Sequence, residues 1–346
     1  MKKIFIVSND KYYIKNKSFY NSNKNTYTII NSVNTFLEVY LVARKIFFKP
    51  KFNTKLNNVF FIKIRDLFNK GDKIKNSKAL IVSLTPFNFF ASLTLILMGI
   101  KKKNFYLFLR SDGFEEYRIK FGKLGVLTYW IMLNIIKNKL NILSCSRSLT
   151  GNFKFRLIFP SEIDEKWLKK RKISRNKKIN TSKTNLLYIG RFRKEKGYLS
   201  IINIFKKLSN RYQLTMIGND QKYLKENNYP QYPNIKIFGQ ISKDNELINY
   251  YDKNDILILP SYIEAYPQVI LESLARLKPI IIFNEIKYLK KTFKYGLFNC
   301  DRNKKSLELT IIKIMNNYQN IQKKIAKEKI FTQKNFFLNM KKIFKS

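Results

Sequence analysis

Short apolar runs alternate with segments of helical periodicity along almost the whole chain. In the amino-terminal half, the runs that predict strands are Ile4–Val7, Val59–Lys63, Ala79–Leu84, Asn104–Arg110 and Leu140–Ser144. In the carboxyl-terminal half, they are Asn185–Gly190, Gln213–Gly218, Ile235–Gly239, Asp255–Pro260 and Pro279–Phe283. Because strands that alternate with helices favour parallel sheets covered by helices, the sequence predicts an α/β protein.

A polar, lysine-rich segment at 166–184 separates the two series of strands and reads as a linker. A chain of 346 residues has room for two domains, which we expect at 1–165 and 185–330. Residues 331–346 predict a final helix that packs back on the first domain. Ligands of such sheets bind at the carboxyl ends of the strands, so we expect the site in the cleft between the domains.

The rare residue types exclude several chemistries. The chain has no histidine, which rules out a His-based catalytic triad and removes the commonest transition-metal ligand. Cys145 and Cys300 are its two cysteines, and their wide separation favours reduced thiols over a disulfide framework or a zinc site. No Asp-x-Asp type of cluster stands out, and we expect no metal and no cofactor.

The charge balance points to an anionic partner. The chain has 68 Lys and Arg against 23 Asp and Glu, and Met1–Arg110 alone has 21 basic residues against four acids. Within this part, Thr35–Phe52 predicts an apolar, aromatic helix with a basic end, suited either to anionic lipid headgroups or to the core. An even spread of lysines from coding bias is the alternative. No nucleic-acid module is recognisable, so no nucleic acid is expected as a partner.

Two apolar segments could be mistaken for membrane signals. The apolar run in "MKKIFIVSND" is too short for a secretory signal and predicts a first strand. Ala79–Ile100 is interrupted by Pro86 and Asn88, so it predicts a strand followed by a buried helix over Phe87–Gly99.

A basic loop follows the first strand of the second series. In "LLYIGRFRKEKGYLS" the strand ends at Gly190, the loop carries Arg191 and Lys196, and a helix begins after Gly197. A helix amino terminus offers unpaired N–H groups and a partial positive charge, so cations just ahead of it favour a diphosphate site. A lysine-rich surface turn is the alternative.

An acidic loop repeats this arrangement in "PSYIEAYPQVILE". Pro267 fits the first helical position, with Tyr266 as the cap. Glu264 then lies just outside the helix and Glu272 inside it, on the order of 10 Å apart at 1.5 Å per residue. Two carboxylates at this spacing favour hydroxyls at the two ends of a nucleotide sugar. For Glu272 the alternative is a solvated helix face shared with Gln268 and Arg276.

Three segments stand in the order and spacing of a known family: "GRFRKEKG" at Gly190–Gly197, the segment Ile235–Ser261, and the E-x7-E segment Glu264–Glu272. With them the sequence resembles the retaining family-4 glycosyltransferases of the GT-B fold, also called glycosyl transferases group 1, of the bacterial surface-polysaccharide type. The resemblance implies two Rossmann-like, doubly wound parallel-sheet domains that face each other across a cleft. It covers most of Asn185–Phe283.

The resemblance also implies roles for single residues. Arg191 and Lys196 match the cations that hold the donor diphosphate, Glu264 the acid beside the transferred sugar, and Glu272 the acid that binds the ribose. The other donor-binding positions implied are Gly190, Gly218, Gly239, Ile241, Ala265 and Tyr266. The chain departs from the family in its amino half, where "VSND" replaces a glycine-rich loop. Asp112, in "FLRSDGFEEY", has no histidine beside it and either orients the acceptor hydroxyl or caps a helix.

The function implied by the resemblance is transfer of a sugar from a nucleotide-diphosphate donor to a glycan or lipid-linked acceptor with retention. Lipopolysaccharide or capsule synthesis is the implied setting. With the charge asymmetry, this favours a cytoplasmic enzyme held peripherally on the inner face of the membrane. A nucleotide-sugar epimerase of the same fold and a non-catalytic nucleotide-binding or nucleic-acid-binding protein are the alternatives.

Overall fold

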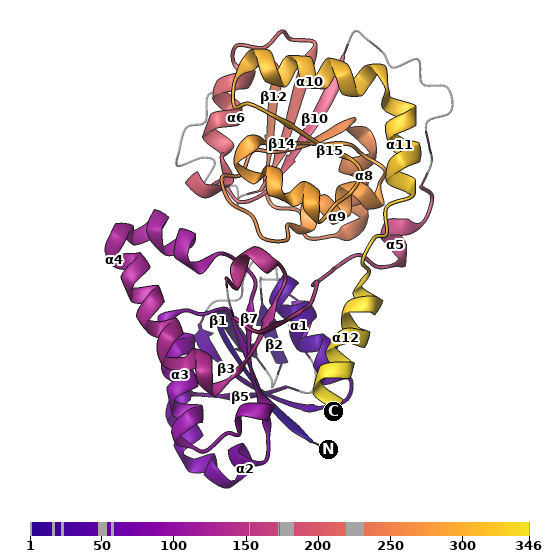
Figure 1. Ribbon diagram of the computed structural model, residues 1–346. Helices are drawn as coiled ribbons and strands as arrows, with labels where there is room; N and C mark the ends of the chain where they lie inside the picture. Colours follow the sequence, from indigo (N-terminus) through magenta and orange to yellow (C-terminus); the bar gives the residue numbers. More distant parts are fainter. Residues whose placement is uncertain are drawn as a thin grey trace. The chain divides into compact units, whose positions relative to one another are not determined.

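The computed structural model describes residues 2–15, 18–21, 24–47, 54–56, 59–151, 153–171, 173, 183–218 and 232–345. The chain forms two compact units (Figure 1). Unit 1 comprises Met1–Glu162 together with Phe331–Ser346, and unit 2 comprises Ile163–Ile330. Each unit contains one sheet with helices against it, as the alternating pattern predicted, so the α/β fold class is confirmed.

The sheet of unit 1 has nine strands among the described residues. They are β1 (Lys3–Lys15), β2 (Ser18–Asn21), β3 (Glu38–Ile46), β4 (Thr54–Leu56), β5 (Val59–Ile62), β6 (Lys78–Val82), β7 (Phe105–Leu109), β8 (Asn141–Ser144) and β9 (Phe155–Leu157). β1 pairs in parallel with β3 and β6, and the parallel series continues to β5 on one side and through β7 and β8 to β9 on the other. β2 and β4 add antiparallel pairings at the end of β1.

The described part of the segment Thr35–Phe52, residues 35–47, is not a helix, and the prediction of a helix there was wrong. Most of this part forms β3, whose Val39, Leu41 and Val42 are buried in the sheet. β3 pairs with β1 from Lys3↔Glu38 onward, so its apolar residues are covered by a neighbour that local sequence cannot reveal. The rest of the segment, residues 48–52, lies outside the described residues.

The described helices of unit 1 are α1 (Lys24–Asn34), α2 (Gly71–Lys75), α3 (Pro86–Leu97), α4 (Gly113–Ile136) and α12 (Gln333–Lys345). The 3-10 turns are η1 (Ile64–Lys70), η2 (Lys102–Asn104), η3 (Lys137–Lys139) and η4 (Arg147–Leu149). The apolar run Ala79–Ile100 is divided between β6 and α3 and is not one continuous helix. Thr85 caps α3 by accepting a hydrogen bond from Asn88 N, and Pro86 fits the start of the helix.

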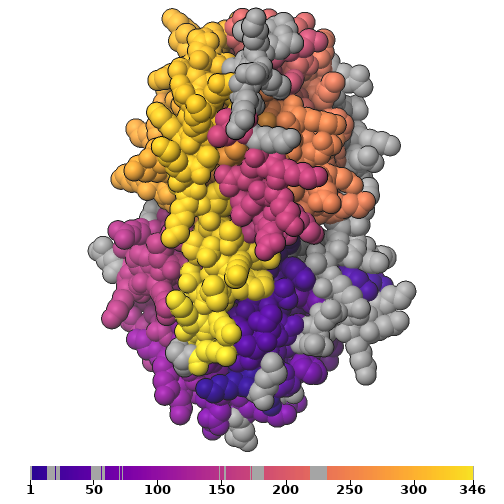
Figure 2. Space-filling model, turned by 90° about the vertical axis from the view of Figure 1, so that its right-hand side faces the viewer, coloured from indigo at the N-terminus to yellow at the C-terminus, as the bar shows by residue number. Residues whose placement is uncertain are grey.

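The carboxyl-terminal helix belongs to unit 1. α12 packs on α1, and the ring of Phe344 meets that of Tyr106 edge to face at 4.9 Å between centroids. Figure 2 shows this end of the chain, in yellow, beside the indigo amino-terminal residues. Phe336, Met340 and Phe344 are buried, so the helix supplies part of the unit's interior.

Unit 2 contains a six-stranded parallel sheet in the order β12-β11-β10-β13-β14-β15 among the described residues. The strands are β10 (Thr184–Ile189), β11 (Tyr212–Ile217), β12 (Ile235–Phe238), β13 (Ile256–Leu259), β14 (Ile280–Phe283) and β15 (Leu297–Cys300). The described helices are α5 (Glu165–Leu168), α6 (Tyr198–Phe205), α8 (Asp244–Lys253), α9 (Gln268–Ala275), α10 (Lys304–Asn316) and α11 (Tyr318–Ala326), with 3-10 turns η5 (Lys194–Lys196) and η6 (Asn284–Lys291).

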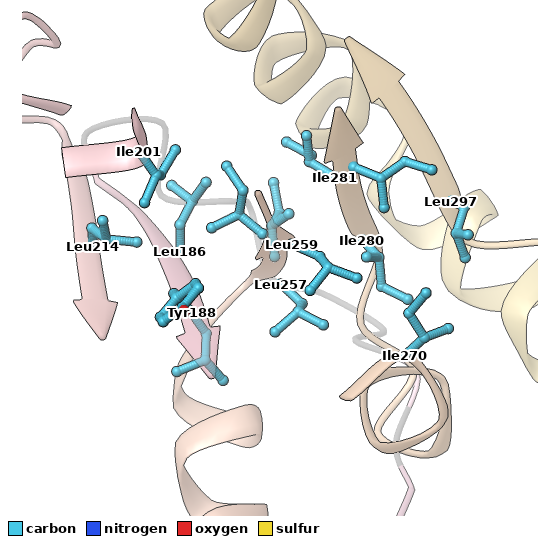
Figure 3. Packing of buried hydrophobic residues seen from close by; sticks show 14 of the residues in the cluster. Leu186, Tyr188, Ile201, Leu214, Leu257, Leu259, Ile270, Ile280, Ile281 and Leu297 are labelled. Carbon is cyan, nitrogen blue, oxygen red and sulfur yellow. The ribbon is translucent and has the colours of Figure 1, made fainter. Parts of the chain in front are cut away.

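The core of unit 2 lies between its sheet and its helices. Figure 3 shows Leu186 on β10, Leu257 on β13 and Ile280 on β14 directed into one apolar cluster, with Ile201 of α6 and Ile270 of α9 from the covering helices. Nearly continuous apolar strands such as Ile256–Leu259 are typical of parallel sheets buried on both faces. These rigid strands hold the loops at their ends.

The expected linker at 166–184 begins inside unit 2. Trp167 of α5 is fully buried and meets the ring of Tyr251 at 5.7 Å, because a large indole ring gains more from the core than from solvent. The unit boundary falls at Glu162/Ile163. Residues 172 and 174–182 of the expected linker lie outside the described part of the chain.

Candidate active site

The strand order of unit 2 places a topological switch point beside β10. From β10 the chain adds β11 and β12 on one side and then crosses to β13 on the other. In open parallel sheets, ligands bind outside the carboxyl ends of the strands at this point, because the loops on the two sides diverge there. The basic loop after β10 and the acidic loop after β13 therefore lie side by side at the carboxyl edge of the sheet, at the switch point.

Glycines let the backbones at this edge approach closely. A Cβ on Gly218 would lie 1.8 Å from the Gly190 carbonyl oxygen, and a Cβ on Gly197 would lie 1.9 Å from the Pro260 carbonyl oxygen. Gly197 also has φ +68°, in the left-handed region that favours glycine. The Tyr262 N–H donates to the Glu195 carbonyl at 2.9 Å, which ties the two loops together.

The basic and acidic loops meet through side chains. Lys196 Nζ lies 2.6 Å from Glu264 Oε1, and Ser261 Oγ donates to the same oxygen at 2.7 Å. The Glu264 side chain is only 10% exposed, so water screens this ion pair weakly. The Glu264 backbone is held as well, because its N–H and carbonyl both bond to the Tyr288 hydroxyl.

Arg191 stands at the same strand end with an exposed side chain. Its backbone is fixed, since the buried Tyr188 hydroxyl donates to the Arg191 carbonyl at 2.9 Å. Burial, and then the charge of Glu264, raise the pKa of Tyr188, so the phenol stays a neutral donor.

The acidic loop leads into α9, which begins one residue later than the sequence predicted. Pro267 is the cap residue with φ −73° and ψ 125°, and Gln268 is the first helical residue, so Tyr266 is not the cap. An extended ψ at Pro267 ends the loop and sets the proline outside the first turn. Gln268 and Val269 are therefore the first residues of α9, at its amino terminus, where the helix dipole is positive.

Glu272 is buried inside α9 and does not lie on a solvated face. Its exposed fraction is 8%, and its Oε2 accepts a hydrogen bond of 2.8 Å from the hydroxyl of Tyr251 on α8. Burial, and then the charge of Glu272, raise the pKa of Tyr251 well above its usual value. Arg276 is also buried, and its guanidinium binds Asp252. The carboxylate is thus oriented by a neighbouring helix.

Four other predicted donor-binding residues lie in two separate parts of unit 2. Ala265 is buried, and the ring of Tyr266 stacks on Phe293 at 5.5 Å, which fixes the loop ahead of α9. Gly239 and Ile241 line a surface pocket of ≈ 380 Å³ whose wall is completed by residues of β12, α8 and the loop between them. These are Phe238, Gln240, Glu246, Asn249 and Tyr250.

Arg302 is a site residue that the sequence reasoning missed. It follows β15, and its Nη1 donates to the Pro260 carbonyl at 2.8 Å and to Ser200 Oγ at 2.7 Å. Its guanidinium lies over the ring of Tyr262 at 4.0 Å, and its Nε donates to Glu285 at 2.8 Å. Arg302 therefore clamps the end of β13 to the first turn of α6.

Asp112 lies in unit 1 and caps α4. Its side chain accepts a hydrogen bond from Glu115 N at 3.1 Å, as the capping interpretation expected. Burial, and then the charge of Glu115, raise the pKa of Asp112 against the lowering effect of the backbone donors. Within the described residues, both cysteines are free and buried, and no cluster of three or more His, Cys, Asp or Glu is placed to hold a metal ion.

Comparison with known proteins finds one family that is similar to most of the unit that holds this geometry. Residues 169–331 match the family Glycosyl transferases group 1. This group 1 match contains every predicted donor-side residue, from Gly190 to Glu272, and leaves Asp112 outside.

Comparisons over longer stretches of the chain extend the likeness to both units. A Klebsiella pneumoniae protein described as "Uncharacterized 41.2 kDa protein in cps region" is 24% identical over 300 residues, covering 75% of this chain and 74% of that protein. Anabaena HepE, solved in complex with UDP and glucose, has a TM-score of 0.70 at 12% identity, with all of both chains covered. The lipopolysaccharide outer core galactosyltransferase WaaB has a TM-score of 0.62 at 15% identity, with 99% of both chains covered. The fold is therefore the two-domain GT-B fold of glycosyltransferases.

Proposed function

We propose that this protein is a metal-independent, retaining glycosyltransferase of group 1. It moves a sugar from a nucleotide-diphosphate donor to a glycan or lipid-linked acceptor in the synthesis of a surface polysaccharide. The observation that carries the proposal is the contact of Lys196 with Glu264 at the switch point of a unit that matches the group 1 family. Similarity to a protein of a cps region and to a lipopolysaccharide galactosyltransferase supports the polysaccharide setting.

In this proposal the donor spans the carboxyl edge of the unit 2 sheet. The nucleotide base occupies the pocket lined by Gly239 and Ile241, and the buried Glu272 carboxylate accepts hydrogen bonds from the ribose hydroxyls. Arg191, Lys196 and the positive end of the α9 dipole face the diphosphate, while Glu264 lies at the sugar. That HepE was solved with UDP supports a nucleotide sugar of this kind.

The proposed chemistry is stabilisation of the leaving diphosphate. The bond from the sugar to the diphosphate breaks, the acceptor hydroxyl oxygen forms its bond on the same face of the sugar, and the hydroxyl proton passes to the departing phosphate oxygen. Arg191 and Lys196 neutralise the charge that develops on the departing phosphate oxygen, and the position of Lys196 against the largely buried Glu264 limits how far water screens its charge. No protein nucleophile takes part, and the cations supply the charge that a divalent metal would otherwise provide. Asp112 stays a candidate for the acceptor side.

A panel of nucleotide sugars tests the proposal. The true donor should raise the melting temperature with concentration, by about 2.7 kcal/mol in unfolding free energy at 100 times its Kd. Mass spectrometry should then detect a transferred sugar only when an acceptor glycan or glycolipid is added. Turnover of the donor without acceptor would favour an epimerase of the same fold instead. If no nucleotide sugar stabilises the protein, the proposal is wrong.

A further inference from the structure

α4 presents an apolar surface to solvent in its second half. Gly122, with φ +62°, bends the helix, as Figure 1 shows, and the 13 residues between Lys123 and Lys137 carry no charge. The large apolar side chains exposed on this half are Leu124, Leu127, Trp130, Ile131 and Ile135. Leu124 is 77% exposed and Trp130 is 53% exposed, so these rings and chains stand out from the surface.

The opposite face of the same helix is apolar and buried. Tyr129, Met132, Leu133 and Ile136 pack in the core of unit 1. A surface helix of a globular protein normally has a polar outer face, because water covers it. α4 departs from this pattern on one continuous outer face, and contiguous exposed apolar surface marks an interaction site.

Basic residues lie at both ends of this apolar face. Lys120 and Lys123 precede it, and Lys137 and Lys139 follow it. The acids of α4, Glu115 and Glu116, belong to the first turn on the other side of the bend, where they pair with Arg118 and Lys120. α3 contacts α4, exposes Phe90 and Leu97, and is followed by the exposed Lys101, Lys102 and Lys103.

The length of the helix favours lying on a bilayer over crossing it. Gly113–Lys139 is the one helix among the described residues that is long and apolar enough to span a membrane. After the bend at Gly122, however, its remaining 17 residues reach only about 26 Å at 1.5 Å per residue, whereas a hydrocarbon core is about 30 Å thick. Crossing would also pull Tyr129 and Leu133 out of the core.

The charge of the chain argues against a second copy as the occupant of this face. Two copies would bring together molecules with a formal net charge of +45 each, with lysines at both ends of the contact. An anionic lipid surface offers the opposite charge at the helix ends and hydrocarbon for the middle.

We infer that the outer face of α4, defined here as Leu124, Leu127, Trp130, Ile131 and Ile135, docks the protein in the plane of an anionic membrane. Trp130 lies at the level of the headgroups with the aliphatic side chains below them, and the flanking lysines meet lipid phosphates. The inference rests on the proposed function in one respect, because a lipid-linked acceptor gives the enzyme a reason to bind a membrane. The docking surface itself is inferred from the exposed residues.

Trp130 provides a direct readout. The chain has two tryptophans, and Trp167 is 1% exposed in the core of unit 2. Addition of vesicles with 30 mol% phosphatidylglycerol in phosphatidylcholine should shift the tryptophan emission to the blue, and brominated lipids should quench it. Trp130→Phe should lose both responses. Vesicles of phosphatidylcholine alone should bind at least 10-fold more weakly, and binding should weaken with salt.

A matched pair of variants locates the surface. Leu127→Gln, Trp130→Gln and Ile131→Gln together should weaken binding to the anionic vesicles by at least 10-fold in sedimentation. The control is a second triple variant, which removes three exposed apolar side chains from α10 and α12: Leu309→Gln, Ile312→Gln and Leu338→Gln. It should change binding to the anionic vesicles less than twofold. Both triple variants should keep the wild-type melting temperature within a few degrees.

Three outcomes would overturn the inference. They are no binding to anionic vesicles at low salt, binding that the α4 triple variant leaves unchanged, and concentration-dependent self-association that this variant abolishes. Vesicle binding is measured without any sugar, whereas donor binding is measured by thermal shift without lipid. The proposed function and the docking surface can therefore fail separately.

Discussion

Lys196 and Glu264 form a 2.6 Å ion pair between two loops that follow adjacent parallel strands. The pair holds the cation of the basic loop against the acid that the resemblance places beside the transferred sugar. Ser261 donates to the same carboxylate oxygen, so Glu264 is oriented before any donor arrives. In the proposed reaction the Lys196 ammonium contacts the donor diphosphate as well as Glu264.

Removal of the Lys196 charge should impair donor handling. We expect Lys196→Ala to lower kcat/KM by roughly 10- to 150-fold, because one charge-assisted contact is worth about 1.5–3 kcal/mol. Steady-state kinetics with the identified donor measures it. Lys194→Ala removes an exposed lysine two residues away and serves as the control, with a change under twofold expected. Equal kinetics in the two variants would refute the assignment.

Tyr251 should act as a positioning residue for Glu272. Tyr251→Phe removes the 2.8 Å hydrogen bond to the carboxylate and should raise the donor KM by about 3- to 10-fold while kcat changes little. Tyr318→Phe removes another buried hydroxyl donor, to the Asp255 carbonyl at 2.7 Å, and should cost stability without affecting KM. A KM effect of the same size in both variants would argue for a purely structural role.

Gly197 should tolerate no side chain. Gly197→Ala combines a left-handed φ with a Cβ placed 1.9 Å from the Pro260 oxygen, and we expect a loss of unfolding free energy of about 2–4 kcal/mol. Gly151→Ala is the matched control, since Gly151 has φ +50° but nothing within 4 Å of its Cβ. It should cost about 1 kcal/mol. Urea unfolding measures both values, and similar losses would mean that the contact with Pro260 relaxes freely.

Because of the ion pair between Arg302 and Glu285, the free energy of unfolding should decrease as the pH falls into the acid range. Although burial raises the pKa of Glu285, the hydrogen bond and charge of Arg302 lower it below its usual value. A carboxyl with a lowered pKa in the folded state stabilises the protein above its unfolded-state pKa and loses that contribution as the pH falls through the folded value. Because Glu285 is more than one third exposed, we expect no more than about 1 kcal/mol.

The variant Arg302→Gln tests this linkage. Its destabilisation should be larger at pH 7 than at pH 3, because the ion pair contributes only while Glu285 is charged. The part that remains at pH 3 reflects the bonds to Pro260 and Ser200. Glu285→Gln should show the same pH trend with a smaller loss. A pH-independent difference would mean that Arg302 acts through its neutral contacts alone.

The sequence predicted the parallel sheets well because their strands are continuous apolar runs, as at Ile256–Leu259 and Ile280–Phe283. It also placed the basic and acidic loops at strand ends, and β10 pairs directly with β13. It failed at Thr35–Phe52, where an apolar run fits either a helix or a strand. Pairing with β1 decides that choice, and this partner lies about 35 positions earlier in the chain.

Features that depend on tertiary contacts could not be predicted. The clamp formed by Arg302 reaches back 42 residues to Pro260, and no local pattern around Arg302 signals it. The start of α9 shifted by one residue because proline fits both the cap and the first helical position. Burial of Glu272 was also hidden, since the covering residue Tyr251 belongs to α8.

The return of α12 to unit 1 has a consequence for biosynthesis. The helix that packs on α1 follows the whole of unit 2 in the chain, so the ribosome makes all of Ile163–Ile330 before unit 1 can close. Unit 2 can complete its own core earlier, although it is encoded later. At about 5–20 residues per second, α1 waits tens of seconds with its docking face uncovered. A chaperone that binds apolar helix faces would therefore act on the first unit for longer than on the second.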